Sequence, residues 1–568
     1  MAPICKAVTA LCLFTFVTLA DTLPTPDIKV DQVGYPIGAT KFAMVVSSTP
    51  ATEFVVKTAG DGSVVFQGKL SPAIQDADSG DSVQAADLSA LETPGRYFIE
   101  VPGVGRSWTF TIGHSVYSRV LYLAMRSFYG QRCGTAVDLG PEFPGYSYSA
   151  CHKRGEYHPS SGKKGAAPSI KGWHDAGDYG RYIVNSGITT GTLLWAWELF
   201  EPRVRQMSLN IPESGDNVPD FLDEIRWNLE WMLSMQDEDG GVWHKQTTEK
   251  FAGFVMPDQD PAVSYVIGTG SDPFKSTCAT ADFAAVMAIA ARVYRPFDVA
   301  FADRCLEASK RAWNWAEKNP GVLFRNPAGV ETGGYGDISC ADELLWASAE
   351  LWRTTADEAY HRYFLAHFSE FRSTIRPEGP PAWQTVGPLG LWTYVLGKKH
   401  DAEAARLIVD DSVKAADQIV ERSVRNGYRI SLTERDYIWG SNSVAANYGL
   451  QLLVANVLRP NKRYVETARD NLHYLLGRNT FSLCWVTRVG ENSFKHPHHR
   501  PSATDKNAEP WPGLLAGGPN RNRQDDAMRR LPNLPPAKMY VDDQASYASN
   551  ENAINWNAAL VFLLAGVE

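Results

Sequence analysis

Residues 107–130 read SWTFTIGHSVYSRVLYLAMRSFYG, and the pattern of the sequence changes within them. The first seven residues, up to Gly113, are rich in β-branched and aromatic side chains, which favours a strand. After His114, apolar residues between Val120 and Met125 recur at the spacing of one helix face. The stretch therefore predicts a boundary between a β-rich part and a helical part of the chain.

The part before this boundary, residues 27–113, contains short β-like runs with turn residues between them. The runs are IKV, FAMVVS, EFVVKT, SVVFQG, RYFIEV and SWTFTIG. About six or seven strands without a helical period predict a small β-sandwich. Carboxylates and histidines do not cluster in this part, so we interpret it as a structural domain.

The part after the boundary, residues 114–568, contains about twelve stretches with a helical period. These are residues 117–130, 182–200, 217–236, 279–295, 298–318, 341–354, 357–368, 386–398, 401–424, 443–457, 461–476 and 551–566. They fit an (α/α)6 barrel of helical hairpins. A helical solenoid would also fit, but no repeat of fixed length supports it. Three loops of the length that is usually functional cover residues 131–181, 237–278 and 477–550.

The composition narrows the class of protein and its partners. The 568 residues are 44% hydrophobic and 21% charged, which suits a globular protein and excludes a disordered one. A net charge of −9 offers no attraction to a phosphate backbone, so we expect no nucleic-acid partner. The 17 Trp are enough for some rings to line a cleft rather than a core. We expect a monomer.

Residues 1–20 read MAPICKAVTALCLFTFVTLA, a lysine before an apolar run that ends in small residues. This pattern is typical of a secretory signal peptide. A membrane anchor is the alternative, but the run is too short to span a bilayer. We therefore expect a secreted, extracellular protein with no membrane association. Its remaining cysteines allow a few disulfides or a metal site: Cys133, Cys151, Cys278, Cys305, Cys340 and Cys484.

The first segment with catalytic potential is KGWHDAGDYG, residues 171–180. Asp175 and Asp178 are separated by Ala-Gly, so both carboxylates could point into one site. Two close carboxylates repel each other, which raises one pKa. One of them could then hold a water molecule while the other accepts its proton. The alternative is a surface turn, because Asp and Gly favour turns.

The second segment is YVDDQASYASNENAINWNA, residues 540–558. Ser549 or Asn550 would cap the last helix and place Glu551 in its first turn. The helix dipole would lower the pKa of Glu551 there, which opposes a general-acid role. Burial among neighbouring rings, or a nearby Asp542, would raise that pKa instead.

Two further segments hold groups that can bind metals. KHPHHR, residues 495–500, contains three histidines, but its proline and arginine make hydrogen bonding to a polyhydroxylated or anionic ligand an equal alternative. Cys133 and Cys151-His152, upstream of His174, offer two thiolates and two imidazoles, which satisfy a closed zinc site. A Cys133–Cys151 disulfide is the alternative.

Together these segments resemble the family 9 glycoside hydrolases, the inverting cellulases, over nearly the whole mature chain. The opening DQVGY, residues 31–35, resembles the immunoglobulin-like module that precedes many members. Cys484 departs from the family pattern, which usually has a small hydroxyl residue or Val there. The resemblance implies an (α/α)6 barrel with an open cleft. It is carried by Tyr540, Asp542, Tyr547, Glu551, Ala553, Asn557, Ala558, Thr487, Gly490, Asn492, Pro497, His498, Arg500 and residues 173–179, 211–214 and 219–224.

The resemblance also implies roles for single residues. Asp178 is the expected general base, Asp175 its partner in holding the water, and Glu551 the expected general acid. Inversion needs room for water, so the base and acid should lie about 6.5–9.5 Å apart. Support of the acid and sugar binding near the scissile bond are expected of His498, Arg500 and Asp542. Rings expected to stack on sugars, with core packing as the alternative, are Trp173, Tyr335, Trp439 and Trp556.

Metal sites follow from the same resemblance. Members with the Cys-x17-Cys-His spacing carry zinc, which implies Cys133, Cys151 and His152 as ligands, with His174 as the fourth and His158 as its competitor. Two sets of hard oxygen ligands suit calcium, with solvated acidic faces or helix caps as the alternative. At the second set the family often adds an Asp where this chain has Gln384. The sets are Glu213, Asp216, Asp220, Asp223 and the Val218 carbonyl, and Asp337, Asp342 and Glu343.

We therefore predict a secreted endo-acting β-1,4-glucanase that hydrolyses cellulose or a related β-glucan with inversion. An exo-acting β-glucosidase, glucosaminidase or cellobiohydrolase of the same family is an alternative if a loop such as 237–278 or 501–539 blocks one end of the cleft. A non-catalytic glycan-binding protein is a second alternative, although intact Asp178 and Glu551 argue against it. A zinc hydrolase that uses the histidine cluster is a third.

Overall fold

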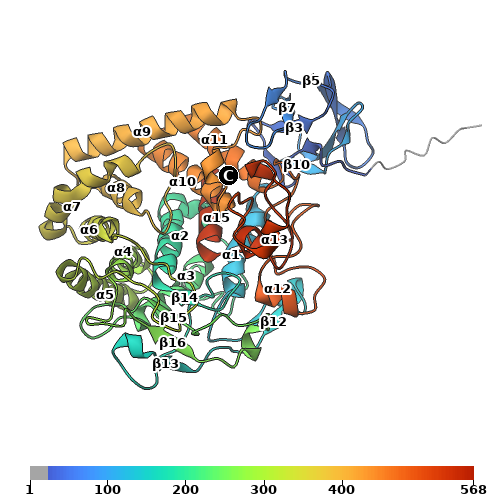
Figure 1. Cartoon of the computed structure of the whole chain (residues 1–568). Helices are drawn as coiled ribbons and strands as arrows, with labels where there is room; N and C mark the ends of the chain where they lie inside the picture. The colour runs from blue at the N-terminus through green and yellow to red at the C-terminus, as the bar shows by residue number, and fades with distance from the viewer. Residues whose placement is uncertain (1–22, 568) are drawn as a thin grey trace, which may run out of the picture.

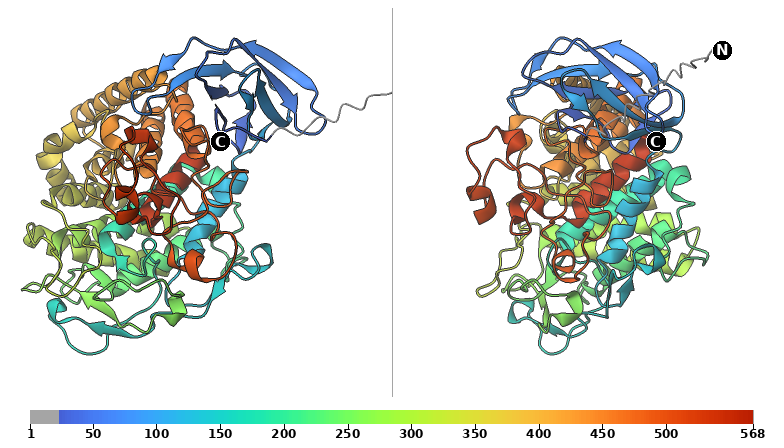
Figure 2. Two further views of the ribbon diagram at one scale, coloured as in Figure 1. Left: turned by 45° about the vertical axis from the view of Figure 1, so that its right-hand side comes forward. Right: turned by 90° about the vertical axis from the view of Figure 1, so that its right-hand side faces the viewer.

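The computed structural model describes residues 23–567, in which a β-sandwich packs against one edge of a larger helical domain (Figure 1). Both views in Figure 2 show the sandwich beside the helical domain rather than apart from it. The predicted signal peptide, residues 1–20, lies outside the described residues.

Two sheets form the sandwich, in the strand orders β1-β3-β7-β6 and β2-β10-β8-β4-β5, with β9 paired to β8. The sequence pattern did not predict β7, because SVQAAD has few β-branched residues, yet this strand pairs with β3 and buries Val83. The strands are β1 (Ile28–Lys29), β2 (Gly34–Pro36), β3 (Phe42–Val46), β4 (Glu53–Thr58), β5 (Val64–Lys69), β6 (Ile74–Gln75), β7 (Ser82–Asp87), β8 (Gly95–Val101), β9 (Gly105–Arg106) and β10 (Phe110–Gly113).

Buried polar contacts fix the sandwich to the helical domain. The Asp31 carboxylate lies 2.7 Å from Nδ1 of His473, and both side chains are buried. The Gln32 amide donates to the backbone oxygen of Ser482 at 2.9 Å. The DQVGY motif is therefore part of the interdomain contact, and the two domains are joined by packing as well as by the chain.

Twelve long helices form the (α/α)6 barrel, which confirms the predicted fold class. The inner helices are buried on nearly all sides: α2 (Ile183–Val204), α4 (Thr277–Tyr294), α6 (Ala341–Thr355), α8 (Gly387–Leu396), α10 (Ser441–Leu458) and α15 (Ile554–Val567). The helices that surround them are largely amphipathic: α1 (Ser118–Gly130), α3 (Asp220–Ser234), α5 (Val299–Lys318), α7 (Glu358–Phe371), α9 (Ala402–Arg425) and α11 (Lys462–Leu475).

Among the described residues, α4 is the one helix that is long and apolar enough to cross a membrane by composition. Of this stretch, 94% is buried inside the protein, and α4 contacts α2, α5 and α6. Small residues on α4, mostly alanine, let its neighbours approach closely. We therefore assign α4 to the core of the barrel.

Short elements organise the loops at one end of the barrel. Four strands pair in the order β13-β16-β15-β14, which brings the loops 131–181 and 237–278 together. In this sheet the Cα atom of Tyr182 is paired with that of Lys245. The elements are β11 (Val137–Asp138), β12 (Ser147–Tyr148), β13 (Gly155–Tyr157), β14 (Arg181–Tyr182), β15 (Lys245–Thr247), β16 (Ser264–Ile267), α12 (Arg500–Thr504), α13 (Asp526–Arg529) and α14 (Tyr547–Asn550).

Candidate active site

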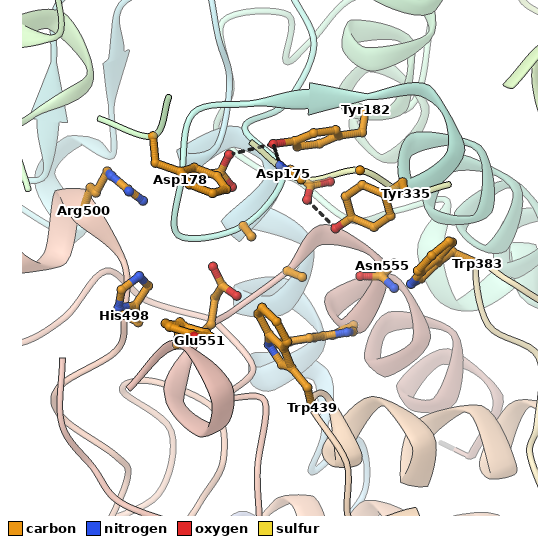
Figure 3. A pocket seen from close by; sticks show the side chains of 17 residues that line it. Asp175, Asp178, Tyr182, Tyr335, Trp383, Trp439, His498, Arg500, Glu551 and Asn555 are labelled. Atoms are coloured by element: carbon orange, nitrogen blue, oxygen red, sulfur yellow. Dashed lines mark hydrogen bonds between the residues drawn. The ribbon is translucent and has the colours of Figure 1, made fainter. Parts of the chain in front are cut away.

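A cleft of about 720 Å³ lies where loops between the barrel helices meet (Figure 3). All three loops that the sequence marked as functional contribute to it, and so does the loop between α5 and α6, which the sequence did not mark by its length. The cleft is lined by Asp175, Ala176, Asp178, Tyr182, Phe251, Gly333, Gly334, Tyr335, Trp383, Trp439, His498, Arg500, Tyr547, Glu551, Ala553, Asn555 and Trp556.

A tight turn, residues 175–180, presents the two aspartates of the first segment to this cleft. The Asp175 N–H donates to the Gly180 oxygen, and the Gly180 N–H donates to Oδ2 of Asp178, both at 2.9 Å. A Cβ on Gly177 would lie 1.8 Å from the His498 oxygen, so only glycine fits. Because Asp175 and Asp178 are 2% and 7% exposed, the alternative of a surface turn is wrong.

Hydroxyl and amide groups orient the two carboxylates of this dyad. Asn185 donates to Oδ1 of Asp175 at 2.7 Å, and the Tyr335 hydroxyl donates to its Oδ2 at 2.6 Å. Tyr182 donates to Oδ2 of Asp178 at 3.2 Å. Burial, followed by the charge of Asp178, raises the pKa of Asp175 to about 8. The repulsion that the sequence predicted therefore acts on Asp175.

Glu551 lies on the opposite side of the cleft from the dyad (Figure 3). Burial, reinforced by the charges of Asp178 and Asp175, raises the pKa of Glu551 well above its ordinary value. The prediction that it lies in the first turn of the last helix is wrong: α15 begins at Ile554, and Glu551 is extended after α14. The Ile554 N–H donates to the Asp175 backbone oxygen at 2.9 Å, so a contact with the dyad turn marks the start of the helix.

Three of the four rings predicted to stack on sugars line the cleft, namely Tyr335, Trp439 and Trp556. Trp439 is 41% exposed, as a platform for a ligand should be. The prediction for Trp173 is wrong. Its ring is fully buried against Phe128, and Nε1 donates to Glu224 at 2.8 Å. Trp173 therefore belongs to the core under the dyad turn.

His498 and Arg500 line the cleft as predicted, and both also hold its walls. His498 uses Nδ1 to donate to the Gln544 carbonyl at 2.7 Å, which leaves Nε2 for a ligand. The Arg500 guanidinium donates to the Gly177 oxygen at 2.7 Å and to the oxygens of Ala252 and Gly253. Arg500 thus ties the dyad turn to the loop that carries Phe251.

Asp542, which was predicted to support the acid and to bind sugar, is not among the residues that line the cleft. It accepts hydrogen bonds from the backbone N–H groups of Lys495 and His496, at 2.7 and 2.8 Å, and from the Asn550 amide at 3.0 Å. Backbone groups therefore satisfy this carboxylate, which fixes the residue that precedes Glu551.

The histidines of residues 495–500 do not converge on one point. His499 contacts Ser502 and Gln131 at 2.9 and 3.0 Å, whereas His498 faces the cleft. In the described part of the chain, no group of potential metal ligands includes them. The geometry therefore gives the zinc-hydrolase alternative no support.

Several cleft residues were not predicted to bind sugar, among them Tyr182, Phe251, Trp383, Tyr547 and Asn555. Phe251 is 49% exposed and lies within a loop already marked as functional, which was a usable signal. Tyr182 lies four residues after Asp178 and could have been considered on that ground. Trp383 and Asn555 had no local signal that separates them from packing residues.

A buried cluster of cysteine and histidine lies directly behind the dyad turn. The ligand atoms of Cys133, Cys151, His152 and His174 all lie within 4.8 Å of one another. The alternative of a Cys133–Cys151 disulfide is wrong, because both thiols are free. His158, the competing ligand, is not part of the cluster.

The chemistry of this cluster fits zinc. Nδ1 of His152 is buried without a hydrogen-bond partner, whereas its Nε2 faces Oδ2 of Asp260 at 3.3 Å. A carboxylate on the far nitrogen is the usual support of a metal-bound histidine. Although burial opposes ionisation, Cys151, Arg181 and His174 hold the pKa of the Cys133 thiol well below its ordinary value. Two sulfur and two nitrogen donors form a closed tetrahedral set.

Carboxylates of the first predicted calcium set already accept hydrogen bonds from protein groups. Both oxygens of Glu213 accept from the Arg132 guanidinium at 3.0 Å, and Oδ2 of Asp220 accepts from a backbone N–H and from Ser214. One carboxylate oxygen of Asp223 is buried without a partner. Burial, then the charges of Asp216, Glu213 and Asp220, raise the pKa of Asp223 to about 7.

The second set is more open to a cation and includes a residue that the sequence did not reveal. Among the described residues, no hydrogen-bond partner reaches the buried carboxylate oxygens of Glu343, those of Asp282, on α4, or one oxygen of Asp337. Oδ2 of Asp342 instead accepts from the N–H groups of Val386 and Gly387. The neighbouring sulfurs of Cys278 and Cys340 form a disulfide, so they are not ligands.

Comparison with known proteins agrees with this architecture. The family described as Glycosyl hydrolase family 9 matches residues 117–564, and the Cellulase N-terminal ig-like domain matches residues 23–106. Endoglucanase D of Acetivibrio thermocellus is 38% identical, over 95% of this chain and 83% of its own length. A xyloglucan-specific endo-beta-1,4-glucanase of Bacteroides ovatus is 37% identical, over 96% and 94%. A crystal structure of a zinc-binding triple mutant of the family 9 endoglucanase J30 superposes with a TM-score of 0.86 at 36% identity, covering 94% of this chain and 99% of that one.

Proposed function

The chain belongs to glycosyl hydrolase family 9, and on that premise we propose that it hydrolyses internal β-1,4 bonds of cellulose or a related β-glucan with inversion. The observation that carries the proposal is the placement of one acidic dyad and one partly buried glutamic acid on opposite sides of a ring-lined cleft. An inverting glycosidase needs one carboxylate to activate water and one carboxylic acid to protonate the leaving oxygen.

Asp178 is the general base in this mechanism. Among the described residues, the hydrogen bonds to its carboxylate from Gly180 and Tyr182 both reach Oδ2, so Oδ1 can accept a proton from the attacking water. Asp175, with its pKa of about 8, holds a proton at neutral pH and can share the same water through a hydrogen bond. Burial separates the roles of two neighbouring carboxyl groups, as acid–base chemistry requires.

Glu551 is the general acid. Its raised pKa keeps the carboxyl protonated until it donates to the glycosidic oxygen. As that proton leaves, the charge of Asp178 disfavours the new carboxylate, and the favourable charge of Arg500 partly offsets it. Tyr335, Trp439 and Trp556 supply the flat apolar surfaces on which pyranose rings can stack.

Endo action and export each have their own support. Two relatives that match almost the whole chain are named as endo-acting glucanases, which favours cleavage within a chain over release from its end. Export is supported by the pattern of residues 1–20 alone.

Metals complete the proposal. Zinc, when bound by Cys133, Cys151, His152 and His174, supplies a structural cross-link next to Asp175 rather than a reaction step. Calcium at Asp282, Asp337 and Glu343 would neutralise carboxylates whose buried oxygens include several without a partner among the described residues.

The test combines two variants with the stereochemistry of the product. Glu551→Gln and Asp178→Asn should each lower kcat on a soluble glucan by about 10²–10⁴-fold, because each removes one proton-transfer group. Glu307→Gln and Asp303→Asn, exposed on α5, are matched controls that should keep full activity. Proton NMR of fresh wild-type product should show the α-anomer, and release of the β-anomer would contradict inversion. A single small product without a fall in viscosity would contradict endo action.

A further inference from the structure

A buried lysine that the mechanism does not use lies behind the dyad. Lys245, on β15, is fully buried, and its ammonium group donates to oxygens of neutral groups. These are Oδ1 of Asn326 at 2.7 Å, the Gly333 carbonyl at 2.7 Å and Oγ1 of Thr332 at 3.0 Å. Burial lowers the pKa of Lys245 to about 7, and the charge of Asp178 opposes this, so the ammonium lies within electrostatic reach of the proposed base.

The neighbours of Lys245 hold the same stretch of chain, residues 332–335. Nε2 of His244 donates to the Gly334 carbonyl at 2.8 Å, while its Nδ1 accepts from a serine hydroxyl. The hydroxyls of Thr247 and Thr332 lie 2.8 Å apart. Side chains from residues 244–247 therefore anchor three consecutive residues of the 332–335 segment.

This segment in turn reaches both carboxylates of the dyad. The Gly333 N–H donates to the Tyr182 hydroxyl at 3.2 Å, and that hydroxyl donates to Asp178. Tyr335 donates to Asp175. Figure 3 shows the two tyrosines side by side, each bonded to a different aspartate. One anchored segment thus determines where both hydroxyl donors sit.

The backbone of the segment needs such an anchor. Tyr335 has φ of +43°, a left-handed conformation that a non-glycine residue keeps only when its surroundings hold it. At Gly333, a Cβ would lie 3.2 Å from three atoms of the Tyr182 ring, its hydroxyl included. A shift of the backbone at this point is therefore passed directly to the group that holds Asp178.

We propose that Lys245 is a positioning residue for hydrolysis, which anchors the 332–335 segment so that Tyr182 and Tyr335 hold Asp178 and Asp175 toward the attacking water. The inference rests on the proposed roles of the two aspartates. It assigns a role to a lysine that is fully buried and is not among the residues that line the cleft.

The main test is Lys245→Met, which keeps the length of the side chain and removes its donors. We expect kcat on a soluble glucan to fall about 10- to 100-fold while KM stays within about twofold, because misplaced groups cost the reaction step rather than binding. The loss should persist on β-cellobiosyl fluoride, whose leaving group needs little help from an acid, because the defect is on the base side. Lys250→Met, at an exposed lysine of the same loop, is the matched control.

A double-mutant cycle tests whether Lys245 acts through Tyr182. Tyr182→Phe removes the hydroxyl between Gly333 and Asp178, so Lys245→Met should lower kcat much less in that background than in the wild type. Equal losses in both backgrounds would overturn this route. If Lys245→Met does not fold, Gly333→Ala replaces it, because its Cβ displaces the same ring.

The remaining outcomes separate this inference from the proposed function. A lower melting temperature with an unchanged kcat per folded molecule would overturn the inference, as would recovery of full rate on the fluoride. If Asp178→Asn abolishes turnover and Lys245→Met leaves it normal, the inference alone fails. If Asp178→Asn keeps full turnover, both the proposed function and this inference fail.

Discussion

Two pairs of cysteines lie beside the two segments that form the base side of the cleft, and the chemistry of the two pairs differs. Cys133 and Cys151 remain free thiols beside His152 and His174, directly behind the dyad turn. Cys278 and Cys340 form a disulfide that joins α4 to the end of the loop that carries Tyr335. Each pair thus lies next to the supports of one or both aspartates.

The neighbours of each pair account for the difference. Arg181 and two imidazoles favour a thiolate at Cys133, and thiolates are the form that binds a metal. Cys278 and Cys340 lie beside Glu343, whose carboxylate already repels Asp342 and Asp282. Further negative charge would be unfavourable there, whereas a neutral disulfide adds none. Local charge, more than cysteine spacing, selects between a metal and a covalent bridge.

The largest effect on stability should come from a change at Cys133 or Cys151, the cysteines of the candidate zinc site. Cys151→Ser removes one of four ligands, so the protein should lose its zinc and, with it, up to about 10 kcal/mol of stabilisation. Metal analysis should find one zinc per wild-type chain and none in the variant, and thermal denaturation should show a much lower melting temperature.

Cys305→Ser is the control for this first prediction. Cys305 is also free and buried but lies outside the cluster, so its variant should keep the zinc although it loses some stability. A wild-type chain purified without zinc, or a Cys151→Ser protein that retains it, would contradict the assignment of this cluster as a zinc site. The two cysteine pairs would then no longer differ as a metal site and a disulfide.

A smaller effect should follow from opening the disulfide. Cys278 and Cys340 are 62 residues apart, and a loop of that length implies about 4 kcal/mol of stabilisation, mainly through the unfolded chain. The double variant Cys278→Ala/Cys340→Ala should lower the urea midpoint accordingly. A reducing agent should have the same effect on the wild type and none on the variant.

The kcat of the disulfide variant tests whether the bridge is needed to position the dyad. Because Lys245 and His244 also hold the 332–335 segment, kcat of the folded variant should change by less than about tenfold. Cys484→Ala, at a buried free thiol, serves as the control. A urea midpoint that does not move would show that the bridge does not form in solution.

Local sequence patterns were sufficient for most helices and for the dyad. Apolar periodicity marked every long helix, and the close spacing of Asp175 and Asp178 put both on one turn whatever lay around it. The cysteine and histidine cluster was also predicted, because Cys133, Cys151 and His152 share one loop with His174, although the choice of zinc over a disulfide came from the family resemblance. In each case the chemistry depends on residues that are near in the sequence.

Errors arose where distant segments decide the outcome. Ser549 and Asn550 look like a helix cap, but a contact between Ile554 and Asp175 coincides with the true start of α15. The residues around Trp173 and Trp439 do not show which ring is buried, because burial depends on packing against distant segments. Asp282 lies in a mostly apolar helix, and its acidic partners follow about 55 residues later, beyond any local pattern.

The smallest effect concerns the carboxylates behind the disulfide. Burial and mutual repulsion raise the pKa values of Asp282 and Glu343 well above the ordinary range. An acid with a raised pKa in the folded state favours folding below its unfolded pKa, and this stability is lost as pH rises through the folded pKa. The metal-free protein should therefore lose stability from about pH 4 upward, because the unfolded chain ionises these groups first.

Calcium should reverse that loss, because it replaces the protons. At pH 8, calcium at 100 times its Kd should raise the free energy of unfolding by about 2.7 kcal/mol, and at pH 5 by much less, since protons then compete for the same oxygens. Asp282→Asn should remove the calcium effect, whereas Asp223→Asn, in the other acidic set, should leave it intact. The opposite pattern would place the ion beside Arg132, and equal effects at both pH values would show that these carboxylates do not bind it. Either result would leave the disulfide, with the hydrogen bonds of Lys245 and His244, to hold the segment that carries Tyr335.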